Sequence, residues 1–112
     1  MTKTLKKQKS ERWAIVGHGP YGLSYGLVKD DDAKIVADKS VRLYRARNIR
    51  LWYGKRGGIT SLAAFGPCGP KMQDSRIGAE ISSMLLLEVK AIHDCTPEAV
   101  AAFATFAAIE VT

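Results

Sequence analysis

The sequence is poor in three features that would place it in a familiar class. Its two cysteines, Cys68 and Cys95, are too few for the disulfide framework that holds small secreted domains together. No apolar run approaches the roughly 20 residues that cross a bilayer, and the N-terminus lacks the apolar block of a secretory signal. With 112 residues, 46% of them hydrophobic, the chain is predicted to form one intracellular domain with a modest core.

Acidic residues are also absent from the stretch 41–56. That stretch holds six cations, which are Arg42, Arg45, Arg47, Arg50, Lys55 and Arg56. Three aromatic residues lie among them: Tyr44, Trp52 and Tyr53. Guanidinium groups bind phosphate through two parallel hydrogen bonds and stack on flat rings, so this composition predicts a ligand that carries phosphate.

A ligand-binding site is therefore predicted at Arg45, Arg47, Arg50, Trp52, Tyr53, Lys55, Arg56, Gly57 and Gly58. In this interpretation Arg47 and Arg50 neutralise the phosphate, and Trp52 or Tyr53 stacks on a base. The backbone amides of the glycine pair approach the anion, as in other anion-binding turns. The alternative is that the arginines pair with neighbouring carboxylates and that the aromatic residues pack in the core.

The first twelve residues form a separate basic segment. Five cations, Lys3, Lys6, Lys7, Lys9 and Arg12, stand there against the single acid Glu11, which gives a net charge of +4. So polar a segment has too little apolar surface to order itself, and a flexible arm over residues 1–12 is predicted, with a globular domain over 13–112. The arm is a candidate nucleic-acid-binding element, and the alternative is a solubilising terminus.

Period-two alternation marks residues 21–28 as a strand. Large residues alternate there with Gly22, Ser24 and Gly26, which places the two sets on opposite faces of a sheet. Further strands are predicted at 13–16, 34–37, 41–44, 49–53 and 84–93, where 41–44 and 49–53 are two strands or one strand bent by a bulge over 45–48. The segment 73–83 has no clear period.

Two helices complete the predicted fold. Thr60 or Ser61 caps a short helix near 60–65, which the Gly-Pro segment 66–70 ends. The sequence Thr96-Pro97-Glu98 supplies a capping hydroxyl, a proline in the first turn and an acid at the positive end of the helix dipole, which predicts a C-terminal helix near 97–107. The fold class is α+β, a small, mostly antiparallel sheet or barrel-like domain of five or six strands.

Motifs for catalysis and metal binding are weak. Gly17-x-Gly19-x-x-Gly22 matches a dinucleotide fingerprint, but the residues after it have the period of a strand, so a glycine-rich hairpin turn is the preferred interpretation. His18, His93 and the two cysteines have no known metal-ligand spacing, and no nucleophile elbow precedes a serine. The chain is predicted to be a non-enzyme without metal or cofactor.

Three blocks of sequence resemble a family of small, uncharacterised, β-rich proteins of tailed phages and prophages. They are Arg45–Tyr53, which reads RARNIRLWY, Gly57–Ala63, which reads GGITSLA, and Ala91–Ala99, which reads AIHDCTPEA. The lysine-rich start and the segment GPCGPKMQDS depart from the pattern. The resemblance implies a phage accessory or structural protein in the cytoplasm of an infected bacterial host, and it carries over no catalytic residue.

Three functions fit these expectations. The first is a homo-oligomeric binding protein that captures an anionic nucleotide-type small molecule, such as a nucleotide signal of host immunity. The second is a nucleic-acid binder that uses the basic arm. The third is a minor structural component of the virion. None of them involves a membrane.

Overall fold

The computed structural model describes residues 11–20, 22–51, 58–67 and 75–106. In chain order the elements are β1 (Arg12–His18), β2 (Gly22–Val28), α1 (Asp32–Asp38), β3 (Ser40–Leu51), α2 (Gly58–Phe65), β4 (Arg76–Ile77), β5 (Ile81–Leu87), β6 (Val89–Asp94) and α3 (Pro97–Thr105). The strands pair antiparallel in one six-stranded sheet, which confirms the α+β prediction. No described helix is both long enough and apolar enough to cross a bilayer.

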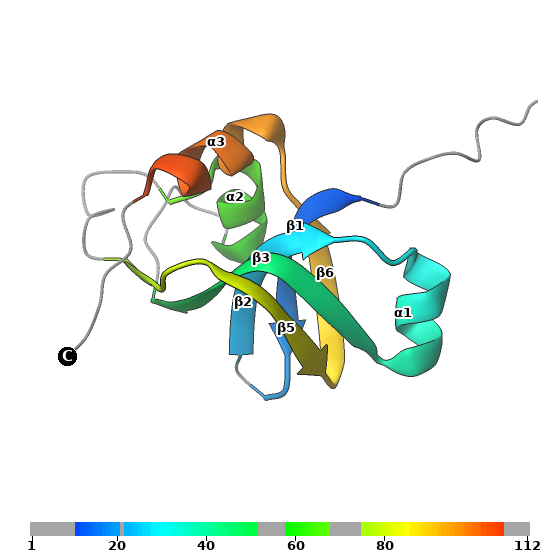
Figure 1. Ribbon diagram of the computed structural model, residues 1–112. Coiled ribbons are helices and arrows are strands. Elements are labelled where there is room, and N and C mark those ends of the chain that lie inside the picture. The colour runs from blue at the N-terminus through cyan, green and yellow to red at the C-terminus, as the bar shows by residue number, and fades with distance from the viewer. Residues whose placement is uncertain (1–10, 21, 52–57, 68–74, 107–112) are drawn as a thin grey trace, which may run out of the picture.

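The sheet curls because one stretch of chain joins its two edges. The strands are ordered β4-β3-β2-β1-β6, and β5 pairs with β3 beside β4. β5 and β6 are separated only by Glu88, which has a left-handed backbone with φ of 55°. The chain thus passes from the β3 edge to the β1 edge at this corner, and the strands form a barrel-like shape (Figure 1). The strand predicted over 84–93 is therefore two strands.

Successive residues along the strands point to opposite faces of the sheet and pack in two separate hydrophobic cores. Ala14 and Val16 of β1 face the inside of the curled sheet, where Leu43, Leu86 and Ile35 of α1 join them. Their neighbour Ile15 faces the outside and packs in a second core, which contains Leu62 of α2 and Phe103 of α3. α1 thus covers one end of the curled sheet, while α2 and α3 cover its outer face (Figure 1).

The small residues of β2 match the space inside the curl. Ser24 and Gly26 are buried on the inner face, and Tyr25 lies on the outer face against the second core. A Cβ atom at Gly26 would lie 3.0 Å from the carbonyl oxygen of Tyr44 and 3.1 Å from the Cβ of Leu43. Any side chain at position 26 therefore requires β3 to shift by a few tenths of an ångström, and the predicted alternation of β2 is confirmed.

The prediction of a strand at 34–37 is wrong, because this segment lies inside α1. The Asp31 side chain accepts a hydrogen bond from the Lys34 amide at 2.9 Å and caps the helix. Lys34 pairs with Asp38 one turn later at 3.0 Å, and Lys39 ends the helix in the left-handed conformation with φ of 56°. Only Ile35 is buried, so a single turn of apolar contact holds the helix to the core.

Both other helices confirm the sequence prediction. α2 begins at Gly58, two residues before the expected 60–65. α3 begins after Thr96, whose Oγ1 accepts from the Ala99 amide at 3.1 Å and donates to the Ala64 carbonyl oxygen of α2. This hydroxyl therefore caps one helix and joins it to the other. The described part of α3 ends at Thr105, and residues 107–112 lie outside the described residues.

Candidate functional site: an arginine and aromatic pocket

A bulge in β3 sets the direction of its arginines. Three residues of β2, from Tyr25 to Leu27, lie opposite four residues of β3, from Arg47 back to Tyr44. The extra residue sits at Arg45, where φ is 52°. The bulge predicted over 45–48 is thus present, in one continuous strand, and it directs Arg45 and Arg47 toward the outer face under α3.

Three aromatic rings form a stack on this face. The Trp13 and Tyr25 centroids are 5.2 Å apart with planes 15° from parallel, and the Tyr25 and Phe103 centroids are 3.9 Å apart at 13°. The stack joins β1 and β2 to α3 and belongs to the outer core. Burial, together with the nearby Cys95 thiol, raises the pKa of Tyr25, while the two arginines act in the opposite direction. The Tyr25 hydroxyl is therefore protonated across the physiological range.

Arg47 is held inside the protein. Only 7% of the residue is exposed, and its Nε donates to the Gly78 carbonyl oxygen at 2.7 Å while Nη1 donates to the Phe103 carbonyl oxygen at 2.8 Å. Phe103 lies in the last turn of α3, where a cation satisfies the free carbonyls and complements the helix dipole. Arg47 thus differs from the expected open phosphate ligand, because two of its five N–H donors already fix β3 to α3 and to the segment after β4.

Arg45 is exposed and only loosely paired. Its Nε donates to Glu80 Oε2 at 3.2 Å, with 62% of the arginine side chain and 47% of the glutamate side chain exposed. The same guanidinium lies over the Trp13 ring, with its central carbon 5.3 Å from the ring centroid. An exposed pair of this kind stabilises a protein by about 0–1 kcal/mol, so another anion can replace Glu80 at little cost.

These residues surround a cavity of about 530 Å³. It is lined by Trp13, Tyr25, Arg45, Arg47, Ala79, Glu80, Val100, Phe103, Ala104 and Phe106. The volume falls in the range of small-molecule sites, and the lining combines flat rings with two cations and one acid. Chemically the cavity can stack a planar ring and place an anionic group against Arg45 and Arg47.

The sequence prediction named only two of the residues that line this cavity. Arg45 and Arg47 line it, whereas Arg50 is exposed on β3 and does not appear in its lining. Gly58 is the first residue of α2. The predicted residues Trp52, Tyr53, Lys55, Arg56 and Gly57 lie outside the described residues. The aromatic contributions of Trp13, Tyr25, Phe103 and Phe106 were missed, although the aromatic residues on two successive predicted strands offered a signal.

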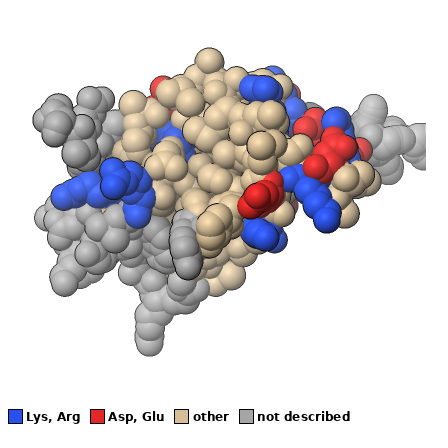
Figure 2. Space-filling view, turned by 90° about the horizontal axis from the view of Figure 1, so that it is seen from below, with Lys and Arg blue, Asp and Glu red and all other residues tan. Residues whose placement is uncertain are grey.

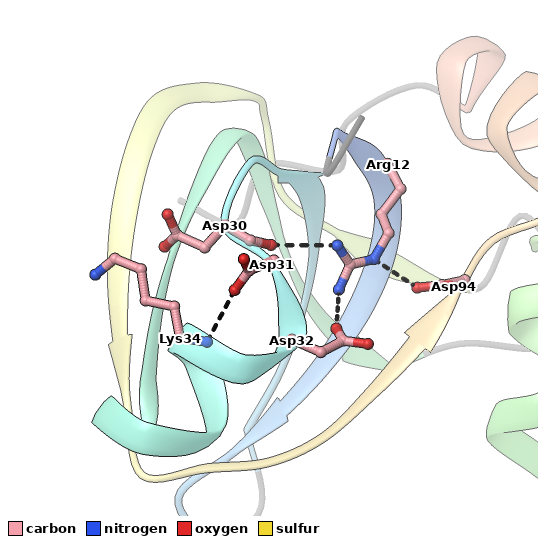
Figure 3. Close-up of polar contacts among 6 residues, drawn as sticks. All are labelled: Arg12, Asp30, Asp31, Asp32, Lys34 and Asp94. Carbon is pink, nitrogen blue, oxygen red and sulfur yellow. Dashed lines mark hydrogen bonds and ion pairs between the residues drawn. The ribbon is translucent and has the colours of Figure 1, made fainter. Parts of the chain in front are cut away.

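Arg12 anchors the start of β1. Its Nε donates to Asp94 Oδ1 of β6 at 3.0 Å, its Nη2 pairs with Asp32 Oδ1 of α1, and its Nη1 donates to the Asp30 carbonyl oxygen at 3.2 Å (Figure 3). Arg12, the last residue of the predicted arm, thus lies in β1, and residues 1–10 of that arm lie outside the described residues, so the arm stays a prediction. The other predicted nucleic-acid-binding residues, Lys3, Lys6, Lys7 and Lys9, lie outside the described residues, and their role stays a prediction.

The glycine motif at 17–22 forms a hairpin. β1 ends at His18 and β2 begins at Gly22, so a strand follows the third glycine where a dinucleotide fingerprint requires a helix. A Cβ atom at Gly22 would lie 2.5 Å from the His18 ring, whose Nε2 is 3.1 Å from Ser24 Oγ. Burial lowers the pKa of His18. The hairpin interpretation is confirmed, and its histidine is engaged with the buried Ser24 hydroxyl.

A second cavity, of about 620 Å³, lies between α1 and β6. Its lining combines apolar residues, such as Ile35, Val36 and Ile92, with two acids and two lysines. Aromatic rings are absent from this lining as far as the structure describes it. Among the described residues no group of three or more histidine, cysteine, aspartate or glutamate residues is arranged to hold a metal ion. The Arg45–Arg47 cavity is therefore the better candidate for recognition of a ring that carries an anion.

Comparisons with known proteins give a family. No curated protein and no solved structure matches the chain. A family model described as a domain of unknown function, DUF6948, matches residues 15–103. This match runs from β1 to α3 and includes both arginines and two of the three stacked rings, those of Tyr25 and Phe103, while Trp13 lies just before it. The chain therefore belongs to the DUF6948 family.

Proposed function

We propose that this protein binds a small phosphate-bearing ligand without chemical conversion, in the cavity under α3. The main support for this proposal is the lining of that cavity, in which two guanidinium groups and four aromatic rings surround a volume of about 530 Å³. A nucleotide contains the two groups that such a lining recognises, a flat base and a phosphate. The base stacks on the partly exposed Trp13 or Phe106, and the phosphate replaces Glu80 on Arg45.

The sequence resemblance extends this proposal to a biological role. As an accessory protein of a phage in the bacterial cytoplasm, a small domain that captures a nucleotide signal acts against host defence by removing that signal. Capture requires affinity alone, which agrees with a cavity built from rings and guanidinium groups. The proposed ligand class is therefore a soluble nucleotide-type signal.

Self-association through β5 is part of the same proposal. Ile81, Leu85 and Leu87 are 48%, 51% and 62% exposed, and β5 carries no charged residue along its seven positions. Within the described residues β5 pairs only with β3. On the face seen from below, uncharged residues form much of the described surface, with acidic and basic side chains grouped beside them (Figure 2). In the proposed dimer, β5 of a second copy pairs antiparallel with β5 of the first about a two-fold axis. The uncharged side chains of the two strands then contact one another, so no like charges face each other across the contact although both molecules are cationic.

Ligand binding is tested by thermal denaturation of the purified protein with cyclic dinucleotides, ADP-ribose analogues and AMP, which carries a terminal phosphate monoester. A bound ligand raises the midpoint, and Arg45→Gln removes the increase while Arg42→Gln retains it. Arg42 is the matched control because it is exposed on the same strand, donates to Ser83 and does not appear in the cavity lining. Absence of any shift at high micromolar ligand, or equal loss in both variants, contradicts the proposal.

Self-association is tested separately by sedimentation. Leu85→Lys is expected to convert an oligomer to a monomer, while Val36→Lys is the control, since Val36 is 73% exposed on α1. A wild-type protein that sediments as a monomer at all concentrations contradicts this part and leaves ligand binding in place.

A further inference from the structure

Glu80 has a special position in the proposed ligand cavity. It is the single acidic residue in the described lining, which otherwise contains the two arginines and uncharged residues. Its carboxylate already holds Arg45 at 3.2 Å, where the anion of a ligand is expected to bind. The cavity therefore contains its own counter-ion.

The negative charge of Glu80 also affects the pKa values of Arg47 and Tyr25. Burial lowers the pKa of Arg47, and the negative charge of Glu80 acts against that effect. The same charge adds to the increase in the pKa of Tyr25. An anion at this position is thus coupled to both arginines and to the central ring of the stack, whereas the pairing itself is exposed and weak.

We infer that Glu80 is a displaceable internal counter-ion that sets the charge a ligand must carry. This inference rests on the proposed function, because it concerns the same cavity. A ligand with one carboxylate only exchanges one carboxylate for another on Arg45 and gains little. A phosphate monoester carries a charge of about −1.5 to −2 at pH 7 and three strong acceptor oxygens, so it outcompetes Glu80 for the guanidinium fork.

The ligand class follows from this competition. Glu80 favours a ring system that bears a terminal phosphate monoester over the same ring with a carboxylate, and it disfavours neutral nucleosides. Binding of such a ligand strengthens between about pH 5 and pH 7, as the phosphate loses its second proton near pH 6. Glu80 is thus a specificity-determining residue in this inference.

The test compares wild type with Glu80→Gln, which keeps the shape of the side chain and removes its charge. Glu98→Gln is the matched control, because Glu98 is an exposed acid in the first turn of α3 and does not line the cavity. The probes are AMP, adenosine, phenyl phosphate and benzoate. Binding is followed by NMR on the Nε–H resonances of the arginine side chains, which report contacts at Arg45 and Arg47 directly.

The expected result is that Glu80→Gln binds AMP and phenyl phosphate up to about fivefold more tightly than wild type, while Glu98→Gln is unchanged. Glu80→Gln is also expected to bind benzoate measurably, because the competing carboxylate is gone. If wild type binds AMP and Glu80→Gln binds it equally or more weakly, the inference is overturned and the proposed function stands. If no probe shifts these resonances in either protein at millimolar concentration, both are overturned.

Discussion

Replacement of Arg47 tests whether this buried guanidinium is a structural clamp. Arg47→Met keeps most of the length of the side chain and removes the hydrogen bonds to the Gly78 and Phe103 carbonyl oxygens, at 2.7 Å and 2.8 Å. Hydrogen bonds from a charged group contribute about 1.5–3 kcal/mol each, and removal leaves two carbonyl groups short of a donor. The guanidinium also costs free energy to bury, and methionine avoids that cost.

The two effects give a loss of about 2–4 kcal/mol in the free energy of unfolding for Arg47→Met. The measurement is urea denaturation followed by circular dichroism, with the slope of the transition compared between proteins. Arg45→Met is the control, since Arg45 is 62% exposed and its pairing with Glu80 contributes at most about 1 kcal/mol.

A second variant separates charge from shape. Arg47→Lys keeps the positive charge but lacks the planar fork, so it reaches one carbonyl oxygen and loses an intermediate amount of stability. An Arg47→Met protein within about 0.5 kcal/mol of wild type would refute the clamp, because a change of that size is typical of an exposed position. Equal destabilisation by Arg45→Met would refute the assignment of the two arginines to different roles.

Three further predictions concern packing, capping and thiol chemistry. Gly26→Ala is expected to lose about 1–3 kcal/mol of unfolding free energy in the urea assay, because the added methyl group would lie 3.0 Å from a carbonyl oxygen of β3. Gly17→Ala is the control and is expected to stay near wild type, because its added methyl group would lie 3.9 Å from the nearest atom. Thr96→Ala is expected to lower the thermal midpoint through a loss of about 1 kcal/mol at the α3 cap, and Thr105→Ala, whose hydroxyl bonds only to carbonyls within α3, serves as its control. Burial raises the pKa of Cys95 to about 12, so the native thiol in a Cys68→Ser background reacts slowly with iodoacetamide at pH 8 and rapidly in urea, as mass spectrometry will show. The unfolded thiol ionises from about pH 8.5 upward while the native thiol does not, so this group lowers stability as the pH rises from about 8.5 to 12. Equal losses in a variant and its control, or equal native and denatured labelling rates, contradict the respective explanation.

The sequence predicted those helices and strands whose stabilising interactions leave a pattern within their own residues. The cap of α3 was predicted because Thr96, Pro97 and Glu98 each suit the first turn of a helix for a separate physical reason. β2 was predicted because its small residues alternate with large ones, and that alternation reflects the close approach of β3. α1 was missed since it spans seven residues and buries only Ile35, so no 3.6-residue period can develop over its length.

The cavity could be predicted only in part, because its geometry depends on contacts between distant residues. A single extra residue in β3 decides which face Arg47 takes, and the sequence located the bulge over 45–48 but did not predict that Arg47 is buried. Trp13, Tyr25 and Phe103 meet only after the sheet and α3 have formed. Glu80 lies in the segment 73–83 that had no clear period, so its pairing with Arg45 had no local signal.

The continuity of β5 and β6 through Glu88 has a consequence for synthesis of the chain on the ribosome. β1 and β3 each obtain a hydrogen-bonding partner from residues 81–94, so a nascent chain that has emerged only through α2 exposes both of those strands along one side. Contacts of this separation close late, and polypeptides truncated before Asp94 are expected to aggregate or be degraded. Residues 81–94 thus govern whether β1 and β3, which are made much earlier, acquire their native pairing.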